Sequence, residues 1–319
     1  MRATRDGFGE AILELAKSDE RIIGLTADLT ESTRMGEFSR QLPSRFWNVG
    51  VSEQNMVGVA TGMSIEGFIP FATTYGVFLG RAWDQIRISV CITKANVKLV
   101  GTHAGVTVGA DGGSAQALED IAMLRALPNL TIVCPCDAVE AKKATLAIAQ
   151  MVGPVYLRLS REPSAQVTTL RTPFVLGRAE ILNSGKDVSI FACGTMVASA
   201  LRAAKDLEKE KISVRIINVH TIKPIDKQTI LASAKETGAV VVAEEHQMEG
   251  GLGSAVAETL ALGLPTPMEQ VAVAHSFGES GTAEGLLIKY KLTPNDIVRA
   301  VKRVLRRKKQ KTNATSSKE

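Results

Sequence analysis

An acidic residue, Glu53, stands where an apolar stretch gives way to a helical pattern, in WNVGVSEQNMVGVATGM at 47–63. The pattern predicts a short buried strand over Phe46–Val51 and a helix over Ser52–Glu66. A carboxylate at a buried junction is costly unless something pairs with it. Glu53 therefore either starts the helix, where the helix dipole favours an acid, or takes part in proton chemistry.

Other residues capable of chemistry follow predicted strands in the same half of the chain. They are Asp28, Tyr75, Phe78 and His103, the last at the start of a Gly-rich loop over 102–116. Ligands of open parallel sheets bind outside the carboxyl ends of the strands. An acid, two rings and a histidine at one such edge predict a pocket for a flat, nitrogen-containing ring, on which the aromatic rings would stack.

The elements that must position these residues alternate between strand and helix, which predicts an α/β fold with mostly parallel sheets covered by helices. One long helix is expected over Phe78–Ile92. The segment REPSAQVTTLRTPF at 161–174, with two prolines, interrupts the alternation and predicts a linker. The expected parts are a first domain over 1–165, a linker over 166–176, a second domain over 177–305 whose last helix ends at Leu305, and a basic tail over 306–319.

Composition places the chain among ordinary globular proteins: 319 residues, 45% hydrophobic and 22% charged. No apolar run approaches the ~20 residues of a membrane span, and we expect a cytoplasmic protein. The cysteines are too few for a disulfide framework and are expected to be buried thiols. The net charge of +5 comes from the terminus, because Lys302–Glu319 holds eight Lys or Arg and one Glu. The rest is near neutral, so we expect no nucleic-acid partner.

Several motifs together resemble the C-terminal half of transketolase, the pyrimidine-binding and C-terminal domains of a thiamine-diphosphate enzyme. They are GVSEQNMVGVATGM, PFATTYGVFLGRAWDQIR, VGTHAGVTVGADG, ACGTMVASALRAAKDL and VVAEEHQMEGGLGSAVAETL. The resemblance covers nearly the whole chain except the basic tail. It implies that Glu53 hydrogen-bonds N1′ of the cofactor's aminopyrimidine, which promotes deprotonation of the thiazolium C2.

The resemblance also implies roles for other residues. Glu53 and His103 would be catalytic; Asp28, Tyr75, Phe78 and Arg81 would join Glu53 in binding the cofactor; Arg161, Ser32, Asp111, Arg5 and Ser114 would bind the substrate. Arg81 stands where many transketolases have an aromatic residue, and is similar to the arginine of 1-deoxyxylulose-5-phosphate synthase. The guanidinium of Arg161 suits the oxygens of a sugar phosphate.

Two departures from the family pattern matter. Ala115 in DGGSAQ stands where the family has a histidine, and alanine offers neither a hydrogen bond nor a proton. The GDG motif that holds Mg²⁺ and the diphosphate is absent, and no metal ligands are expected in this chain. An N-terminal, diphosphate-binding partner subunit should supply them, in an expected α2β2 assembly.

The expected reaction is transfer of a two-carbon ketol unit between phosphorylated sugars. Arg161, Asp111 and the EGGLG motif favour this reaction. One alternative is the β subunit of a 2-oxo-acid dehydrogenase, which shares the architecture and the cofactor. Another, suggested by Ala115 and the basic tail, is a non-catalytic subunit.

Overall fold

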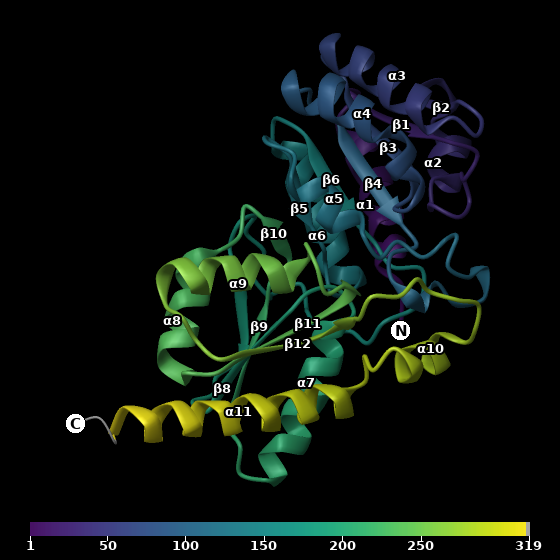
Figure 1. Cartoon of the computed structure of the whole chain (residues 1–319). Helices are drawn as coiled ribbons and strands as arrows, with labels where there is room; N and C mark the ends of the chain where they lie inside the picture. Colours follow the sequence, from purple (N-terminus) through teal and green to yellow (C-terminus); the bar gives the residue numbers. More distant parts are fainter. Residues whose placement is uncertain (317–319) are drawn as a thin grey trace.

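In the computed structural model, the described residues are 1–316, with side chains to residue 310, and they form two sheets covered by helices (Figure 1). The first sheet has seven strands in the order β10-β5-β6-β4-β3-β1-β2, and all its pairs are parallel except β10 with β5. Its strands are β1 (Ile22–Thr26), β2 (Phe46–Asn48), β3 (Ile69–Tyr75), β4 (Lys98–Thr102), β5 (Thr131–Val133), β6 (Val155–Arg158) and β10 (Thr221–Lys223).

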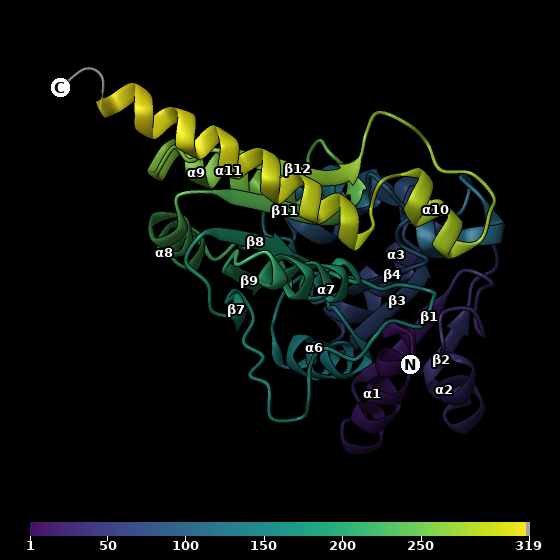
Figure 2. The ribbon, with the colours of Figure 1, turned by 90° about the horizontal axis from the view of Figure 1, so that it is seen from below.

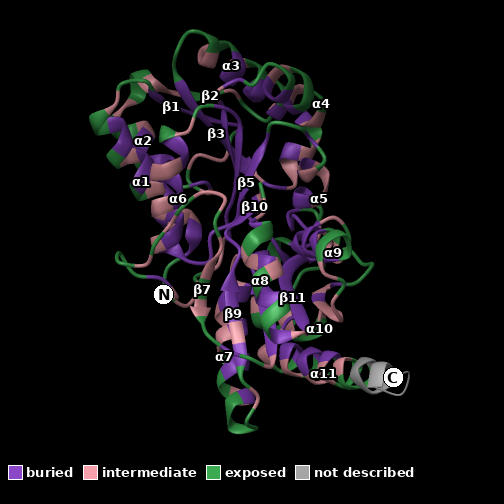
Figure 3. Ribbon diagram, turned by 90° about the vertical axis from the view of Figure 1, so that its left-hand side faces the viewer, coloured by how far each residue is buried: buried purple, intermediate pink, exposed green. Residues whose placement is uncertain are grey.

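Alternating side chains of the first sheet point to two different helical layers. Ile22 and Phe71 pack in one core with α1 (Thr4–Ser18), α2 (Gly36–Gln41) and α6 (Ala138–Gln150). Ile23 and Leu25 pack in another. That second layer consists of α3 (Glu53–Ile65), η2 (Phe78–Ala82), α4 (Trp83–Gln85), η3 (Ile86–Ile92) and α5 (Asp120–Arg125), with the short helices η1 (Pro43–Arg45) and η4 (Val106–Asp111) in loops. Buried strands between helices with exposed outer faces are visible in Figure 3.

The second sheet has five strands in the order β12-β11-β8-β9-β7, with only β7 antiparallel to its neighbour. Its strands are β7 (Glu180–Asn183), β8 (Val188–Ala192), β9 (Val214–Asn218), β11 (Val240–Gln247) and β12 (Met268–Val273). Helices α7 (Met196–Lys209) and α11 (Pro294–Ser316) cover one face, and α8 (Lys227–Thr237) and α9 (Leu252–Gly263) the other. Helix α10 (Ala283–Lys289) instead packs on η4 of the first domain (Figure 2).

The two halves of the sequence contribute to a common sheet and a common core. Strand β10 belongs to the second half yet extends the first sheet, and the core on the α3 side of the first sheet continues beneath α8 and α9. The four cysteines are free and buried. None of the helices in the described part of the chain is long and apolar enough to cross a membrane.

Three predicted elements need correction. The strand before Glu53 is only β2, and Trp47 and Asn48 are exposed because β2 is the edge strand. The single helix expected over Phe78–Ile92 is instead a 3₁₀ helix containing Gly80, one α-turn and a π-helical segment; glycine is a weak helix former.

The third correction concerns the helix expected to end at Leu305, because α11 runs on to Ser316. The first residues of the expected basic tail therefore belong to a packed helix. Arg307 Nη1 donates to Met268 O at 2.8 Å and to Glu269 Oε1 at 2.9 Å, and Lys308 Nζ donates to Thr237 O at 2.7 Å. The last tail residues, 317–319, lie outside the described residues.

Candidate functional site at the edge of the first sheet

The carboxyl ends of β1, β3 and β4 meet at one edge, because these parallel strands are neighbours. Tyr75 is the last residue of β3, His103 directly follows β4, and Asp28 lies just beyond β1. Helix α3, which begins at Glu53, packs against β3. The edge therefore assembles the residue types that the sequence placed at strand ends.

Glu53 presents a buried carboxylate at this edge. Its side chain is 2% exposed. Arg81 Nη1 donates to Oε1 at 3.2 Å and to Oε2 at 3.1 Å, and the Thr74 hydroxyl donates to Oε1 at 3.4 Å. A charge removed from water needs such partners. The carboxylate is thus held in place by two neighbouring elements, β3 and η2.

Three rings form a continuous aromatic stack beside Glu53. The ring of Tyr75 lies 3.6 Å from that of His103 and 5.1 Å from that of Phe78, measured between centroids, with interplanar angles of 17° and 14°. The guanidinium carbon of Arg81 lies 4.5 Å from the centroid of Phe78. Glu53, Arg81 and the stack therefore form one connected group, and its half-buried rings offer a platform for another flat ring.

His103 is buried and remains neutral at physiological pH. Burial lowers its pKa to about 3, with further lowering by the positive charges of Arg5, Arg161 and Arg34. Its Nδ1 shares a hydrogen bond of 2.9 Å with the Thr102 hydroxyl. A neutral imidazole has one donor and one acceptor. His103 can therefore exchange hydrogen bonds with a hydroxyl group but does not add a cation to the site.

A basic end of the site lies beyond His103, made of Arg5, Ser32, Arg161 and Asp111. Arg5 Nη1 donates to Ser32 O at 2.9 Å, and Arg161 Nη1 donates to Val108 O at 2.5 Å and to Asp111 Oδ1 at 3.2 Å. Burial is the first cause that lowers the pKa of Arg5, followed by the neighbouring charge of Arg34. Among the described residues, the buried Nε of Arg5 has no hydrogen-bond partner. Two guanidinium groups near enough for the charge of Arg161 to lower the pKa of Arg5 suit an anion.

Sequence reasoning missed two residues of the site. Thr74 bonds Glu53. Arg34 lies two residues after Ser32 and contributes charge at the basic end, with its Nε donating to Asp6 Oδ1 at 2.6 Å. The proximity of Arg34 to Ser32 in the sequence was an available signal. Nothing in the sequence marked Thr74, since threonine is common in strands.

Some expected residues stand apart from the connected group. Asp28 is exposed, and its Oδ1 accepts from Asn48 Nδ2 at 3.2 Å. Ser114 is exposed on the loop after η4. Ala115 beside it is buried, with its N–H donating to Gly112 O at 3.0 Å. The loop therefore presents backbone and Ser114, rather than an imidazole, where the family pattern has a histidine.

A buried ion pair joins β6 to α5 in the same domain. Arg158 donates to Asp120 through Nε at 2.8 Å and Nη2 at 3.1 Å, and the Tyr156 hydroxyl donates to Asp120 at 2.6 Å. Arg158 Nη2 also donates to Glu245 O at 3.1 Å, which ties the first sheet to β11. His246 is wholly buried; its Nδ1 bonds Gln247 O and its Nε2 accepts from Ala122 N. These contacts give His246 a structural role.

The residues fit part of a thiamine-type cofactor and not all of it. The buried acid and the ring platform suit an aminopyrimidine, which stacks and hydrogen-bonds. No group of three or more His, Cys, Asp or Glu side chains among the described residues could hold a metal ion. The described residues thus suit the heterocycle of such a cofactor.

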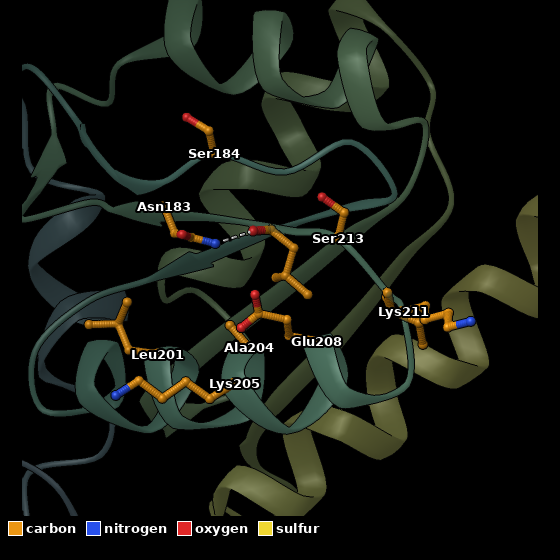
Figure 4. A pocket seen from close by; sticks show the side chains of 10 residues that line it. Asn183, Ser184, Leu201, Ala204, Lys205, Glu208, Lys211 and Ser213 are labelled. Carbon is orange, nitrogen blue, oxygen red and sulfur yellow. Dashed lines mark hydrogen bonds between the residues drawn. The ribbon is translucent and has the colours of Figure 1, made fainter.

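A separate pocket of about 440 Å³ lies in the second domain, between α7 and strands β7 and β9 (Figure 4). Asn183 Nδ2 donates across it to Val214 O at 2.7 Å. Leu201, Lys205 and Glu208 of α7 also line the pocket. None of the residues of the site edge is among those that line it.

Comparison with known families defines the class of this chain. Residues 1–165 match the pyrimidine-binding domain of transketolase, and residues 177–297 match the transketolase C-terminal domain. The chain belongs to the transketolase family. Enzymes of this family are transferases that use thiamine diphosphate, so the matches do not favour a 2-oxo-acid dehydrogenase subunit or a non-catalytic role.

Individual proteins that are similar to this chain show which part of a transketolase it corresponds to. The 6-deoxy-6-sulfo-D-fructose transketolase subunit SqwH of Clostridium sp. (strain MSTE9) is 42% identical over 305 residues, covering 95% of each chain. Mouse transketolase is 37% identical, but this chain spans only 48% of its length. A solved split-gene transketolase, described as an inactive β4 tetramer, superimposes with a TM-score of 0.90 at 46% identity, covering 96% of this chain and 99% of that one. The chain thus has the domain content of the C-terminal subunit of a split transketolase.

Proposed function

We propose that this chain, as one half of a split transketolase, transfers a two-carbon ketol unit between phosphorylated sugars with thiamine diphosphate. The observation that carries the proposal is the buried Glu53 carboxylate, joined to the aromatic stack at the edge where the parallel strands end. When bound, thiamine diphosphate supplies the nucleophilic carbon that cleaves a ketose. Glu53 would hold the proton of the pyrimidine N1′, and the half-buried rings of Tyr75 and Phe78 would fix the plane of the heterocycle.

The basic end supports the choice of an anionic sugar. The unpartnered Nε of Arg5 and the guanidinium of Arg161 would bind the terminal phosphate. Ser32 and Asp111 would contribute polar contacts beside them, and Asp28 and Ser114 stay proposed contacts of the cofactor and the substrate. Neutral His103, the ring of the aromatic stack that feels the charges of the basic end, would hydrogen-bond a sugar hydroxyl.

A sulfonate is the second candidate for the anionic group. The Clostridium relative's name specifies a sulfonated fructose, and the likeness covers 95% of both chains. Guanidinium groups bind the oxygens of both anions, so the residues at the basic end do not choose between them. Transfer from xylulose 5-phosphate and from 6-deoxy-6-sulfofructose, each with a phosphorylated aldose acceptor, distinguishes the two.

The partner subunit would dock on the outer face of α3. A Cβ added to Gly58 or Gly62 would meet no atom of the described residues within 4 Å. Glycine inside a helix costs up to ~1 kcal/mol relative to alanine. We infer that close approach by another chain would explain two glycines on this face. Ile65 and Ile92 are 73% and 62% exposed on α3 and on η3, which packs against α3. Because α3 begins with Glu53, this partner would meet the site directly.

The partner would supply Mg²⁺ and the diphosphate contacts in an α2β2 assembly. The free cysteines agree with the reducing cytoplasm that we propose as the location.

The test is reconstitution with the diphosphate-binding subunit, followed by a ketol-transfer assay of Glu53→Gln. Loss of an acid–base group is expected to lower the rate by roughly 10²–10⁴-fold. Glutamine keeps the shape and can still bond Thr74, so the melting temperature should change little. Glu66→Gln, an exposed site that follows the same helix, is the matched control. Retention of full transfer by Glu53→Gln would rule out the proposed role of this chain.

A further inference from the structure

Arg81 contacts both features of the site that would receive the aminopyrimidine. It donates two hydrogen bonds of 3.1 and 3.2 Å from Nη1 to the carboxylate of Glu53. It also covers the ring of Phe78 at 4.5 Å from the centroid. Tyr75 takes one face of Phe78, which leaves the other face for the guanidinium. The site thus offers a planar group two kinds of contact: hydrogen bonds to Glu53 and stacking on Phe78.

A guanidinium resembles an aminopyrimidine in the relevant chemistry. Both are planar and stack on aromatic faces, and an aminopyrimidine that is protonated at its ring nitrogen presents an N–H edge as a guanidinium does. The carboxylate of Glu53 can accept from either group, but the two N–H edges compete for the same oxygens. An arginine that remained against Glu53 would therefore oppose the proton of the cofactor's ring nitrogen by like-charge repulsion.

The two partners differ in their freedom to move. The side chain of Glu53 is 2% exposed and is also held by Thr74, whereas that of Arg81 is 55% exposed. Among the described residues, the polar contacts of Arg81 are with Glu53 alone. The guanidinium of Arg81 can swing into solvent once another group pairs with the carboxylate, whereas Glu53 cannot leave without moving α3.

We propose that Arg81 is an internal stand-in for the cofactor's pyrimidine: it pairs with Glu53 and covers Phe78 until the heterocycle displaces it. The inference rests on the proposed function and revises the role expected for Arg81, from a cofactor contact to a competitor of the cofactor. Its effect is to keep a buried carboxylate paired in the subunit before assembly.

The first measurement uses the full chain alone and no cofactor. Arg81→Met keeps much of the side-chain length but removes the charge, so Glu53 loses its ion pair and the melting temperature should fall by several degrees. The double variant Glu53→Gln with Arg81→Met should recover most of that loss, because neutral glutamine needs no cation. Arg87→Met, on the exposed side of η3, is the control. Equal losses in the single and double variants would overturn the pairing.

The second measurement titrates thiamine diphosphate, with Mg²⁺, into the reconstituted complex and follows tryptophan fluorescence. Arg81→Met should bind about tenfold more tightly than the wild type, because no side chain has to be displaced and an unpaired carboxylate gains a partner. Equal or weaker binding overturns the stand-in and leaves the proposed function standing. A wild-type complex that does not bind the cofactor overturns both.

Discussion

His103 gives the chain a pH dependence that can be calculated and measured. Its pKa is lowered from 6.5 to about 3 in the folded chain, first by burial and then by Arg5, Arg161 and Arg34. Between these two values the unfolded chain binds a proton that the folded chain excludes. The free energy of unfolding therefore rises with pH across this window, and stability is lost as the pH falls below 6.5.

The size of the loss follows from the two pKa values. At pH 4.5, about 99% of the unfolded imidazoles but only about 3% of the folded ones carry a proton. Linkage then gives a loss of about 2.5 kcal/mol between pH 7 and pH 4.5 from His103 alone. Other titrating groups also change the free energy of unfolding with pH, so the effect of His103 is measured as a difference between two proteins.

Urea denaturation of the wild type and of His103→Gln at pH 7 and pH 4.5 isolates the contribution of His103 to the free energy of unfolding. Glutamine can keep a bond to Thr102 and does not titrate, so the wild type should lose about 2.5 kcal/mol more than the variant over this interval. His275→Gln, whose side chain is 77% exposed, controls for the substitution itself. Equal losses in the wild type and His103→Gln would refute a neutral, buried His103 and the hydrogen-bonding role derived from it.

Two further predictions address the partner surface and the buried ion pair. Gly62→Trp should leave the circular dichroism and melting temperature of the chain unchanged but abolish co-elution with the diphosphate-binding subunit; a complex of normal size would place the partner elsewhere. Asp120→Asn should lower the free energy of unfolding by about 3–5 kcal/mol in urea, because it leaves Arg158 buried without its counter-charge. A loss equal to that of Glu119→Gln, an exposed neighbour, would contradict this.

Strands and helices that pack on adjacent elements could be predicted from the sequence. Val188–Ala192 and Met196–Lys209 carry apolar patterns with the periods of a strand and of a helix, and the structure forms β8 and α7 there. β10 was missed because three residues carry no period, and its partner β5 lies far away in the sequence. The extension of α11 beyond Leu305 was missed because its ion pair joins Arg307 to Glu269 on β12, a contact that local composition does not show.

The site could be located from the sequence, but its contacts could not. Strand ends predicted that Tyr75, His103 and Glu53 would share an edge, since parallel strands point the same way. The pairing of Arg81 with Glu53 and the stacking of His103 on Tyr75 depend on side-chain directions from separate elements. Packing in three dimensions sets these directions, so the spacing of residues in the sequence does not predict them.

The second domain holds the basic end of the site in place, but within the described residues it does not contact the end that contains Glu53. Glu245, in β11, accepts from Thr107 N at 2.6 Å and from the Thr195 hydroxyl at 2.8 Å, and burial raises its pKa. These bonds hold η4, whose Val108 and Asp111 in turn position Arg161. If η4 moved away, Glu245 would remain buried without the N–H of Thr107 as a donor, which is costly. The basic end therefore depends on both sheets, whereas Glu53 and the rings depend on the first sheet alone. Loosening the second domain should therefore disturb the proposed anion contacts of Arg161 before it disturbs the proposed proton role of Glu53.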